Sequence, residues 1–205
     1  MHTSQLLGLG FLAGSLLVVA CGEEENGNGS DPPGPPAGSL VSAFGADGIV
    51  TSNPSPDWES ASGVTLDATH MYVVGADAVL GSSDGQWRIE KRSLDDGALD
   101  PSFGTSGVIQ TNPGSETDWI WAVALDATSL YIGGWDKSPG DLQWRVEKRS
   151  LSDGALDTGF GTGGVVTSNP TGAADSLAAM LVVDDSLYLV GSSEGDSRIE
   201  KRSTA

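Results

Sequence analysis

The sequence predicts an all-β fold, a β-propeller-like array of three four-stranded antiparallel repeats. The first observation is a repeated unit: a Phe-Gly pair occurs at Phe44, Phe103 and Phe160, which are 59 and 57 residues apart in a chain of 205 residues. The second is an alternation of apolar and polar residues with a period of two, which indicates strands. The third is a set of Asp-Gly pairs between such runs, typical of hairpin turns. A long, constant period is the signature of a solenoid, a propeller or an array.

Each unit is expected to contain four short strands. Its apolar runs are short and are separated by turn residues. Outside the N-terminal segment, no window of helical length carries an apolar stripe with a period of 3.6 residues. Four strands per unit are typical of a propeller blade. The expected strands are Trp121–Leu125, Leu130–Gly133, Trp144–Leu151 and Gly164–Ser168.

The strand that begins at Trp144 has two different faces. Alternation places Trp144, Val146 and Lys148 on one face, and Glu147 with its two flanking arginines on the other. The Glu-Lys-Arg triplet recurs near residues 90 and 200. We expect the glutamate face to be solvated, with charge pairs across neighbouring strands. A stripe for docking a partner is the alternative.

The two ends of the repeat region are complementary. The chain begins with a half-unit, Leu40–Phe44, that the last unit lacks, and the last unit stops at the strand Arg198–Ser203. We therefore predict that these two segments pair and close the array, within one chain or between two chains. A homodimer is the alternative to a ring of three units, which would each turn by roughly 120°. The folded domain is expected at residues 39–205, with repeats at about 39–97, 98–154 and 155–205.

The third unit carries a resemblance to a known repeat. Its text LDTGFGTGGVVTSNP, followed by AAMLVVDDSLYLVGSS, is similar to the delta-60 repeat, a predicted β-propeller family of bacterial secreted and envelope proteins. The resemblance covers residues 39–205 and implies a binding or scaffolding surface, with no family catalytic residues to carry over. Closed propellers typically have roughly four to eight blades, so three units depart from that pattern. The matching features are Leu156-Asp157, Phe160-Gly161, Gly163-Gly164-Val165-Val166 and the strand Leu187 to Gly191.

The N-terminal segment, residues 1–20, has the features of a lipoprotein signal peptide. Leu6–Ala20 is an apolar run with the length of a secretory signal core, short for a membrane span. It ends in Val18-Val19-Ala20-Cys21, which resembles a bacterial lipobox, whose cysteine is acylated and becomes the mature N-terminus. Cys21 is the only cysteine, so it cannot form an intrachain disulfide. A plain signal peptide with an incidental cysteine is the alternative.

Residues 21–38 are expected to be a disordered tether, because they are rich in Gly, Pro and Glu and poor in apolar residues. Lipid on Cys21 would then hold the domain at the cell envelope. In a host with two membranes we expect the outer one, because Gly and not Asp follows Cys21. The formal net charge of −18 at pH 7 disfavours nucleic acid and anionic lipid surfaces as partners, since both are negative.

Patterns for catalysis or metal binding are sparse. His70 is the only histidine after Cys21, and we expect it in the turn that precedes Tyr72. This excludes His-rich zinc sites and Cys/His dyads. Carboxylates are plentiful, but they recur in successive units or beside a turn glycine, which favours turn and capping roles. No cofactor is expected, with Ca²⁺ in Asp-Gly turns as the alternative. These carboxylates are Asp67, Asp95, Asp96, Asp126, Asp153, Asp157, Asp184 and Asp185.

Tryptophans are the best candidates for ligand contact, because an indole ring at the rim of such a fold can stack on a sugar or anchor a protein. Trp87 and Trp144 occupy equivalent repeat positions and are expected to pack between units, whereas the third unit has Ser197 there. The candidates in loops or near strand ends are Trp58, Trp119, Trp121 and Trp135.

Together these features predict a lipid-anchored, non-catalytic module of β-propeller type that binds a protein or a glycan at the cell envelope, or acts there as a scaffold. One alternative is a carbohydrate-active hydrolase or lyase that uses two acidic residues. Another is a structural surface protein without a ligand.

The lipobox-like sequence predicts that residues 1–20 are removed and that Cys21 carries lipid. Mass spectrometry of the mature protein is expected to find a chain that begins at Cys21 with acyl groups attached, because more than one acyl chain is needed for firm anchoring. The Cys21→Ala variant should be released from membranes or processed incorrectly. An unmodified Cys21, or cleavage at another bond, would show that the segment is a plain signal peptide.

Overall fold

Every long regular element of the described chain is a strand, because the sequence consists of short β-branched runs separated by glycine turns. We analyse a computed structural model of the protein, which describes residues 34, 36–79, 84–114, 116 and 118–205. Those residues contain eleven strands and no helix, and from residue 36 onward they belong to one compact unit. The predicted signal peptide, Cys21 and most of the predicted tether lie outside the described residues.

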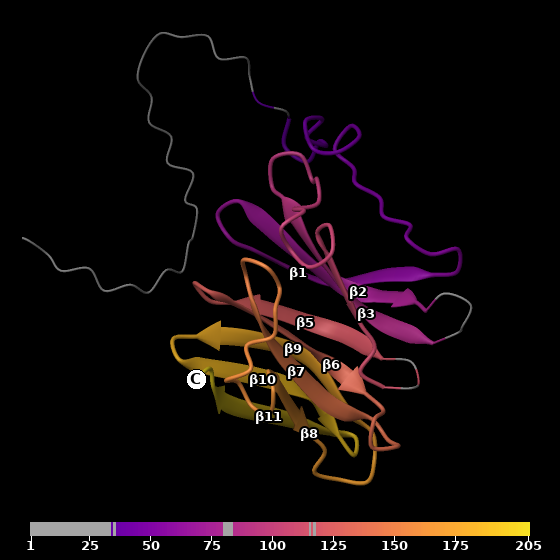
Figure 1. The fold of residues 1–205 in the computed structure, drawn as a ribbon, viewed down its shortest axis with the longest axis vertical. Helices are drawn as coiled ribbons and strands as arrows, with labels where there is room; N and C mark the ends of the chain where they lie inside the picture. The colour runs from indigo at the N-terminus through magenta and orange to yellow at the C-terminus, as the bar shows by residue number, and fades with distance from the viewer. Residues whose placement is uncertain (1–33, 35, 80–83, 115, 117) are drawn as a thin grey trace, which may run out of the picture. The chain divides into compact units, whose positions relative to one another are not determined.

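The strands form three antiparallel sheets that follow one another along the chain (Figure 1). The first sheet contains, in order, β1 (Glu59–Leu66), β2 (His70–Ala78), β3 (Gly85–Ser93) and β4 (Val108–Thr111). The second contains β5 (Trp119–Leu125), β6 (Ser129–Asp136), β7 (Gln143–Ser150) and β8 (Val165–Ser168). The third contains β9 (Asp175–Val183), β10 (Ser186–Ser193) and β11 (Asp196–Ser203), with β10 in the middle.

The predicted all-β array of three antiparallel repeats is confirmed, although the third sheet has three strands instead of four. The described residues form no closed ring of sheets, so the propeller interpretation stays a prediction. The sheets are offset from the sequence repeats, because β4 lies beyond residue 97 and β8 lies beyond residue 154. Each of the first two sheets thus takes its last strand from the start of the next sequence unit.

Closure of the array within one chain is not found among the described residues, and pairing between two chains, the other form of that prediction, stays a prediction. Among the described residues β11 pairs only with β10, and Leu40–Phe44 forms no strand. The N-terminal segment packs on the first sheet instead. The Gly45 amide donates to the Asp96 carbonyl oxygen at 3.0 Å, and the Phe44 ring lies against Gly97. These contacts hold the segment at the end of the stack opposite β11 (Figure 1).

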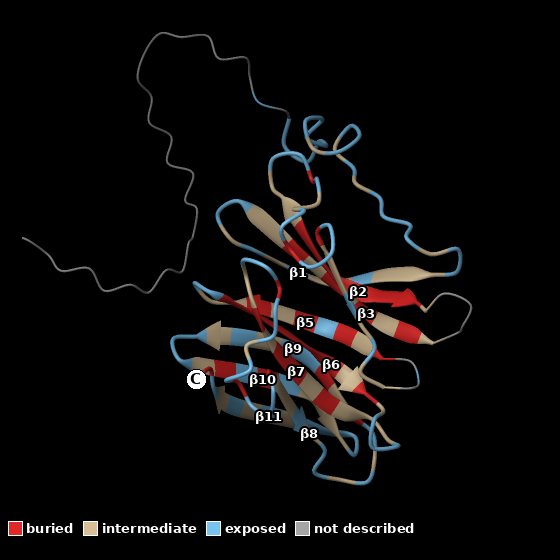
Figure 2. Ribbon diagram, in the orientation of Figure 1, coloured by how far each residue is buried: buried red, intermediate tan, exposed pale blue. Residues whose placement is uncertain are grey.

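Two apolar clusters lie between successive sheets (Figure 2). The first cluster holds Trp87 and Ile89 of the first sheet with Ile132 of the second. The second cluster holds Trp144 of the second sheet with Leu189 of the third. All five side chains are buried, which confirms that the repeated tryptophans pack between units. Burial of each large apolar side chain contributes roughly 1.5–3 kcal/mol, so these clusters are a main source of stability.

The predicted alternation in β7 is confirmed, but the expectation that its charged face is solvated is wrong. Glu147 has no exposed surface, because it is the register partner of Ile132 and shares the face that packs toward the first sheet. The Glu147 carboxylate is paired within its own strand, where Arg145 and Arg149 bind it at 2.7 and 2.6 Å. The expected pairing across strands also occurs, because Arg145 lies 3.7 Å from the Asp136 carboxylate of β6. A buried carboxylate needs such partners. Equivalent Arg-Glu-Arg triads are centred on Glu90 and Glu200.

The lysines of the first two triplets point the other way and link neighbouring sheets. Lys91 Nζ donates to the Leu151 carbonyl oxygen, directly after β7, at 3.2 Å. Lys148 Nζ repeats the contact one sheet later, at 2.8 Å from the Thr204 carbonyl oxygen. Each lysine thereby ties its sheet to the end of the third strand of the next sheet.

Turn roles are confirmed for the repeated aspartates whose carboxylates accept backbone amides in these turns. The Asp67 carboxylate accepts the amides two and three residues ahead, at 2.7 and 2.8 Å. Asp126 caps the equivalent turn of the second sheet in the same way. Asp96 and Asp153 each accept the amide two residues ahead in the Asp-Gly turns. These bonds replace backbone partners that a tight turn cannot supply.

The glycines that follow the repeated phenylalanine adopt a left-handed backbone, as their recurrence predicts. Gly45, Gly104 and Gly161 have φ values of 58°, 55° and 56°. A Cβ atom at Gly161 would also overlap the carbonyl oxygen of Val165. Glycine is therefore required at this position by both backbone angle and space.

Gly161→Val is expected to lower the free energy of unfolding by about 1–3 kcal/mol, because it adds backbone strain and a clash with the adjacent carbonyl. Urea denaturation measures the change. The matched control is Gly172→Val, since Gly172 is exposed and no heavy atom lies within 4 Å of a Cβ built there. Equal stability of the two variants would contradict the assignment.

Candidate ligand-binding site

Three tryptophans from two sheets stack in one column. The Trp58 ring stacks on Trp119 with centroids 5.3 Å apart and an interplanar angle of 12°. Trp119 stacks in turn on Trp121 at 5.6 Å and 13°. Trp58 directly precedes β1 and the other two belong to β5, so the column bridges the first and second sheets. Trp121 is 43% exposed, and the other two rings are half-buried. We name these three residues the tryptophan column.

The column is not part of the repeat. The strand registers place Ser60 in β1 and Ser176 in β9 at the position that Trp119 holds in β5. Tryptophans that pack between sheets recur at equivalent positions of the first two sheets, as Trp87 and Trp144 do in the buried core. The first and third sheets form with serine at the Trp119 position, so an indole ring is not a requirement of the sheet.

The structure brings together three of the four sequence candidates, Trp58, Trp119 and Trp121. Trp135 is not one of the stacked rings: it lies on β6, half-buried, as the register partner of both Trp119 and Trp144. Sequence reasoning could not find the stacking, because Trp58 and Trp119 are 61 residues apart. The one available signal is the Asp-Trp pair that occurs at both places.

A buried carboxylate lies beside the column and was missed from the sequence. Asp118 directly precedes Trp119 and has no exposed surface, as is also true of Asp136 at the end of β6. Asp118 Oδ2 accepts the Gly114 amide at 2.7 Å. Burial raises the pKa of Asp118 to about 6, and the negative charge of Asp136 adds to the rise, while the Gly114 bond opposes it. The residue before Trp119 is therefore a buried carboxyl whose pKa is raised to about 6.

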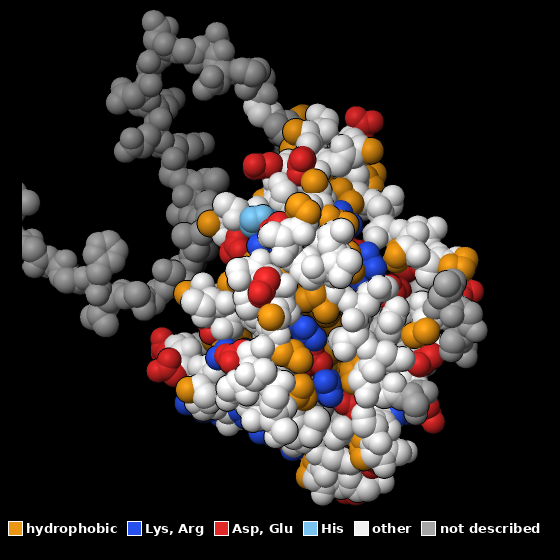
Figure 3. Space-filling view, in the orientation of Figure 1, with side chains coloured by type: hydrophobic (Ala, Val, Ile, Leu, Met, Phe, Trp, Pro, Cys, Tyr) orange, Lys and Arg blue, Asp and Glu red, His pale blue; other side chains and the backbone are white. Residues whose placement is uncertain are grey.

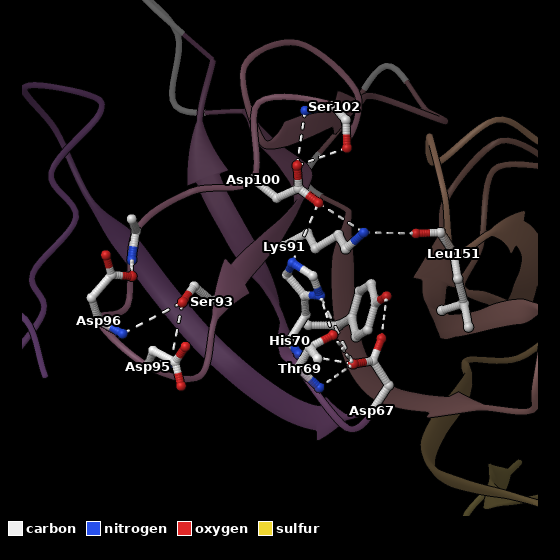
Figure 4. A network of polar contacts seen from close by, with 12 residues as sticks. Asp67, Thr69, His70, Lys91, Ser93, Asp95, Asp96, Asp100, Ser102 and Leu151 are labelled. Carbon is white, nitrogen blue, oxygen red and sulfur yellow. Dashed lines mark hydrogen bonds and ion pairs between the residues drawn. The ribbon is translucent and has the colours of Figure 1, made fainter.

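His70 is the first residue of β2, one position beyond the turn in which the sequence predicts it, and lies within a network of polar contacts (Figure 4). Its Nδ1 atom is 2.8 Å from Thr69 Oγ1, and its Nε2 atom is 3.5 Å from the Asp100 carboxylate. Lys91 binds that carboxylate at 2.8 Å and lowers the pKa of Asp100. Hydroxyl, imidazole and carboxylate are the groups of a nucleophilic triad. However, the equivalent turn of the second sheet has Ser129 in place of the histidine, so the network does not require an imidazole.

The outer face of the first sheet is hollowed by a cavity of about 340 Å³. Phe44 and Val50 of the N-terminal segment form one wall, and Met71 and Val73 of β2 form another, beside the Arg-Glu-Arg triad of β3. The corresponding face of the second sheet is covered by the first sheet. The cavity therefore marks a sheet-packing surface that the described residues leave uncovered.

Other site types have little support in the described part of the chain. Within those ranges, no group of three or more His, Cys, Asp or Glu side chains is arranged to hold a metal ion. A search of the same residues also finds no helix of the length and apolarity needed to span a membrane. Figure 3 shows acidic side chains scattered over the visible face and not gathered in one patch. The tryptophan column is thus the feature that most needs an explanation beyond the fold.

Comparison of the chain with protein-family models, with curated proteins and with solved structures finds no match. The resemblance to the delta-60 repeat accordingly stays a prediction, and the candidate site is defined by its own geometry.

The raised pKa of Asp118 predicts that stability falls as the pH rises. The folded state holds this proton more tightly than the unfolded chain, where the pKa is near 3.8. The stabilisation that the proton gives to the folded state is therefore complete below about pH 4 and is lost as the pH passes about 6. The contribution is about 1–3 kcal/mol. Asp118→Asn should therefore make the melting temperature less dependent on pH between about pH 4 and 7. Asp57→Asn, at an exposed aspartate beside Trp58, is the matched control. A pH profile that Asp118→Asn leaves unchanged would rule out this group.

Proposed function

We propose that this protein is a non-catalytic, lipid-anchored binding module of the cell envelope, of β-propeller type, which binds a glycan on the tryptophan column. The observation that carries the proposal is the column itself. Its rings stack at 5.3 and 5.6 Å, and its central ring stands where the other two sheets have serine.

Exposure separates the column from the structural tryptophans. Trp87 has no exposed surface and Trp144 is 1% exposed, whereas 43% of Trp121 is in contact with solvent. Large apolar rings that only stabilise a fold are normally buried as far as their polar atoms allow. Aromatic rings that remain partly exposed and held in place by neighbouring rings are typical of binding surfaces.

The surroundings of the column suit a sugar. One face of a pyranose ring presents C–H groups that can pack on an indole, while its hydroxyls need polar partners at the edge. Glu59 follows Trp58 and accepts the Ser55 amide at 2.8 Å. Glu116 and Lys137, close in sequence to Trp119 and its register partner Trp135, form an exposed ion pair at 2.8 Å. These groups are the polar partners that we propose for the sugar hydroxyls.

A neutral glycan is favoured over an acidic protein partner by the charge of the chain. The net charge of −18 repels acidic macromolecules at long range, whereas a neutral sugar is unaffected. One aromatic contact contributes about 0.5–1.5 kcal/mol, so a single sugar would bind weakly. We therefore expect an oligosaccharide that contacts several rings or edges at once.

Anchoring at the envelope is the second part of the proposal, and its support comes from the sequence. The apolar run Leu6–Ala20 and the lipobox-like end at Cys21 precede a polar, Gly- and Pro-rich segment. A tether of that composition would let the folded domain reach ligands beyond the membrane surface. In a host with two membranes, the glycine after Cys21 favours the outer membrane.

The proposal predicts that Trp121→Ala weakens oligosaccharide binding about three- to tenfold, which corresponds to the loss of one aromatic contact. A glycan array of neutral and charged oligosaccharides identifies the probe, and calorimetric titration with the best one measures the affinity. Trp121→Phe should fall between the parent and Trp121→Ala, because a smaller ring remains.

Leu181→Ala is the matched control, since Leu181 is 60% exposed on β9 and is not part of the column. It should bind as the parent does. No binding to any glycan on the array would reject the glycan ligand. Capture of a defined envelope protein that depends on Trp121 would instead assign the column to a protein partner.

A further inference from the structure

The chain carries at its two ends the complementary halves of a junction that it uses twice internally. At the first internal junction β4 pairs with β3, and the loop before β4 packs on the second sheet, where the Gly104 amide donates to the Asp153 carbonyl oxygen at 2.9 Å. At the second junction β8 pairs with β7, and Ser168 Oγ donates to Glu200 Oε1 of the third sheet at 3.0 Å. Each junction thus has a pairing half and a packing half.

The N-terminal segment 41–52 has the packing half alone. Its Gly45 amide donates to the Asp96 carbonyl oxygen at 3.0 Å, and Ser52 Oγ donates to Glu90 Oε1 at 3.1 Å. These are the counterparts of the two packing bonds of the internal junctions. Among the described residues, no strand pairs with residues 49–52.

The segment nevertheless already has the backbone shape of a junction loop. The Gly48 amide donates to the Phe44 carbonyl oxygen at 2.8 Å, and the Ala46 amide donates to the Ile49 carbonyl oxygen at 2.8 Å. The matching bonds of the two internal loops measure 2.8–2.9 Å. Pairing with a strand would therefore require little rearrangement of this segment.

The edge of β11 lacks the neighbour that β3 and β7 have. β11 pairs with β10 on one side, and in the described chain no strand lies on the other side. On the two internal strands the equivalent edge is used: the amides of Lys91 and Lys148 each donate at 3.0 Å to a glycine carbonyl of the following loop. Their counterpart is Lys201. A row of unpaired amides and carbonyls is a template for another strand.

The apolar face of the third sheet is also uncovered. Tyr188, Val190 and Ile199 are 36%, 39% and 75% exposed. The second sheet covers the corresponding face of the first sheet completely, and the counterparts there have no exposed surface: Tyr72, Val74 and Ile89.

The opposite end of the stack has the surface that such a face packs against. Val64 and Leu66 of β1 are 62% and 58% exposed, whereas their counterparts in β5, Val123 and Leu125, pack against the first apolar cluster. The cavity of about 340 Å³ lies on this same outer side of the first sheet.

We propose that a second copy of this chain completes both ends, head to tail. Residues 49–52 of one copy pair antiparallel with β11 of another, and the third sheet of one copy packs on the first sheet of the next. Val50 then faces Ile199, and the Lys201 amide donates to the Gly48 carbonyl oxygen. The contact is heterologous, so copies add in one direction unless two of them close into a ring. The internal pairs that set this register are Ile89–Ile109 and Val146–Val166.

One substitution makes this junction weaker than the internal ones. Lys91 is held by the Asp100 carboxylate at 2.8 Å, but the position equivalent to Asp100 in the N-terminal segment is Val41. Lys201 would therefore meet Val41 and gain no ion pair. We expect the association between copies to be reversible and to depend on protein concentration.

Light scattering of the full chain in mild detergent, over a range of concentrations, tests the association. The mass is expected to rise above that of one chain as the concentration increases. Ile199→Pro should keep the protein monomeric. The Ile199 amide points to the open edge, as that of Lys201 does, so proline removes a donor of the proposed junction and leaves the hydrogen bonds between β11 and β10 in place. Ile199→Lys is a second variant that leaves the backbone donor in place and should also weaken association. A single-chain mass at every concentration of the parent overturns the proposal.

A gain of association tests the identity of the surfaces. Val41→Asp supplies the carboxylate that the internal junctions have, and is expected to lower the dissociation constant about two- to fivefold at low salt. The gain should vanish when Lys201→Gln is added, since no cation then faces the new carboxylate. A gain that persists in the double variant would contradict the proposed contact.

The register is tested by disulfide cross-linking between two variants that are mixed and oxidised. Chains with Val50→Cys and chains with Ile199→Cys should form a mixed dimer, whereas Ser52→Cys with Ile199→Cys, which is two residues out of register, should link less. The parent chain, which has Cys21 alone, gives the background. Preferential linkage of Ile199→Cys chains to one another would show that two β11 edges pair, and would overturn the head-to-tail arrangement.

Discussion

Contact between unlike faces of successive sheets is the constraint on which the rest of this structure depends. Each sheet has one face with a tyrosine and a lysine and an opposite face with an Arg-Glu-Arg triad. Three or four short strands cannot bury either face alone. When the tyrosine face of one sheet meets the triad face of the next, Ile89 and Ile132 are buried together, and Lys91 reaches the carbonyl of Leu151. One geometry thus satisfies the apolar and the polar groups at the same time.

The buried triads show how this stack accommodates charge. An isolated Glu147 carboxylate without solvent would cost several kcal/mol, and two arginines at 2.6 and 2.7 Å offset that cost. Because residues two apart in a strand share a face, Arg145, Glu147 and Arg149 are aligned by the strand before the sheets pack. The triad is therefore a local unit that needs no partner from the neighbouring sheet. The carboxylate of Asp118 has no such arginine, which is why its proton is retained to higher pH.

Local features of this fold could be predicted from the sequence, and features that depend on the packing of one sheet on another could not. Period-two alternation and the recurring Phe-Gly pair indicate strands and a left-handed glycine at Gly161, because both follow from a few adjacent residues. The same alternation places Glu147 on a face, but it contains no information about what covers that face. Stacking of Trp58 on Trp119 likewise depends on how two sheets meet. Alignment of the repeats shows that the two ends of the chain are complementary. It does not show whether the ends pair within one chain or between two copies, because that depends on where they lie in space.

The unequal environment of the three sheets has a consequence for motion. In a linear array each unit is stabilised mainly by its neighbours, and local opening is easiest where few contacts must break. The second sheet packs on both faces, while the third has three strands and an exposed face. Hydrogen exchange should accordingly be slowest in β6 and fastest in β11. Two of the three rings of the tryptophan column belong to β5 of the second sheet, so the proposed ligand surface rests on the sheet with the most neighbours, where little ordering entropy is left to lose on binding.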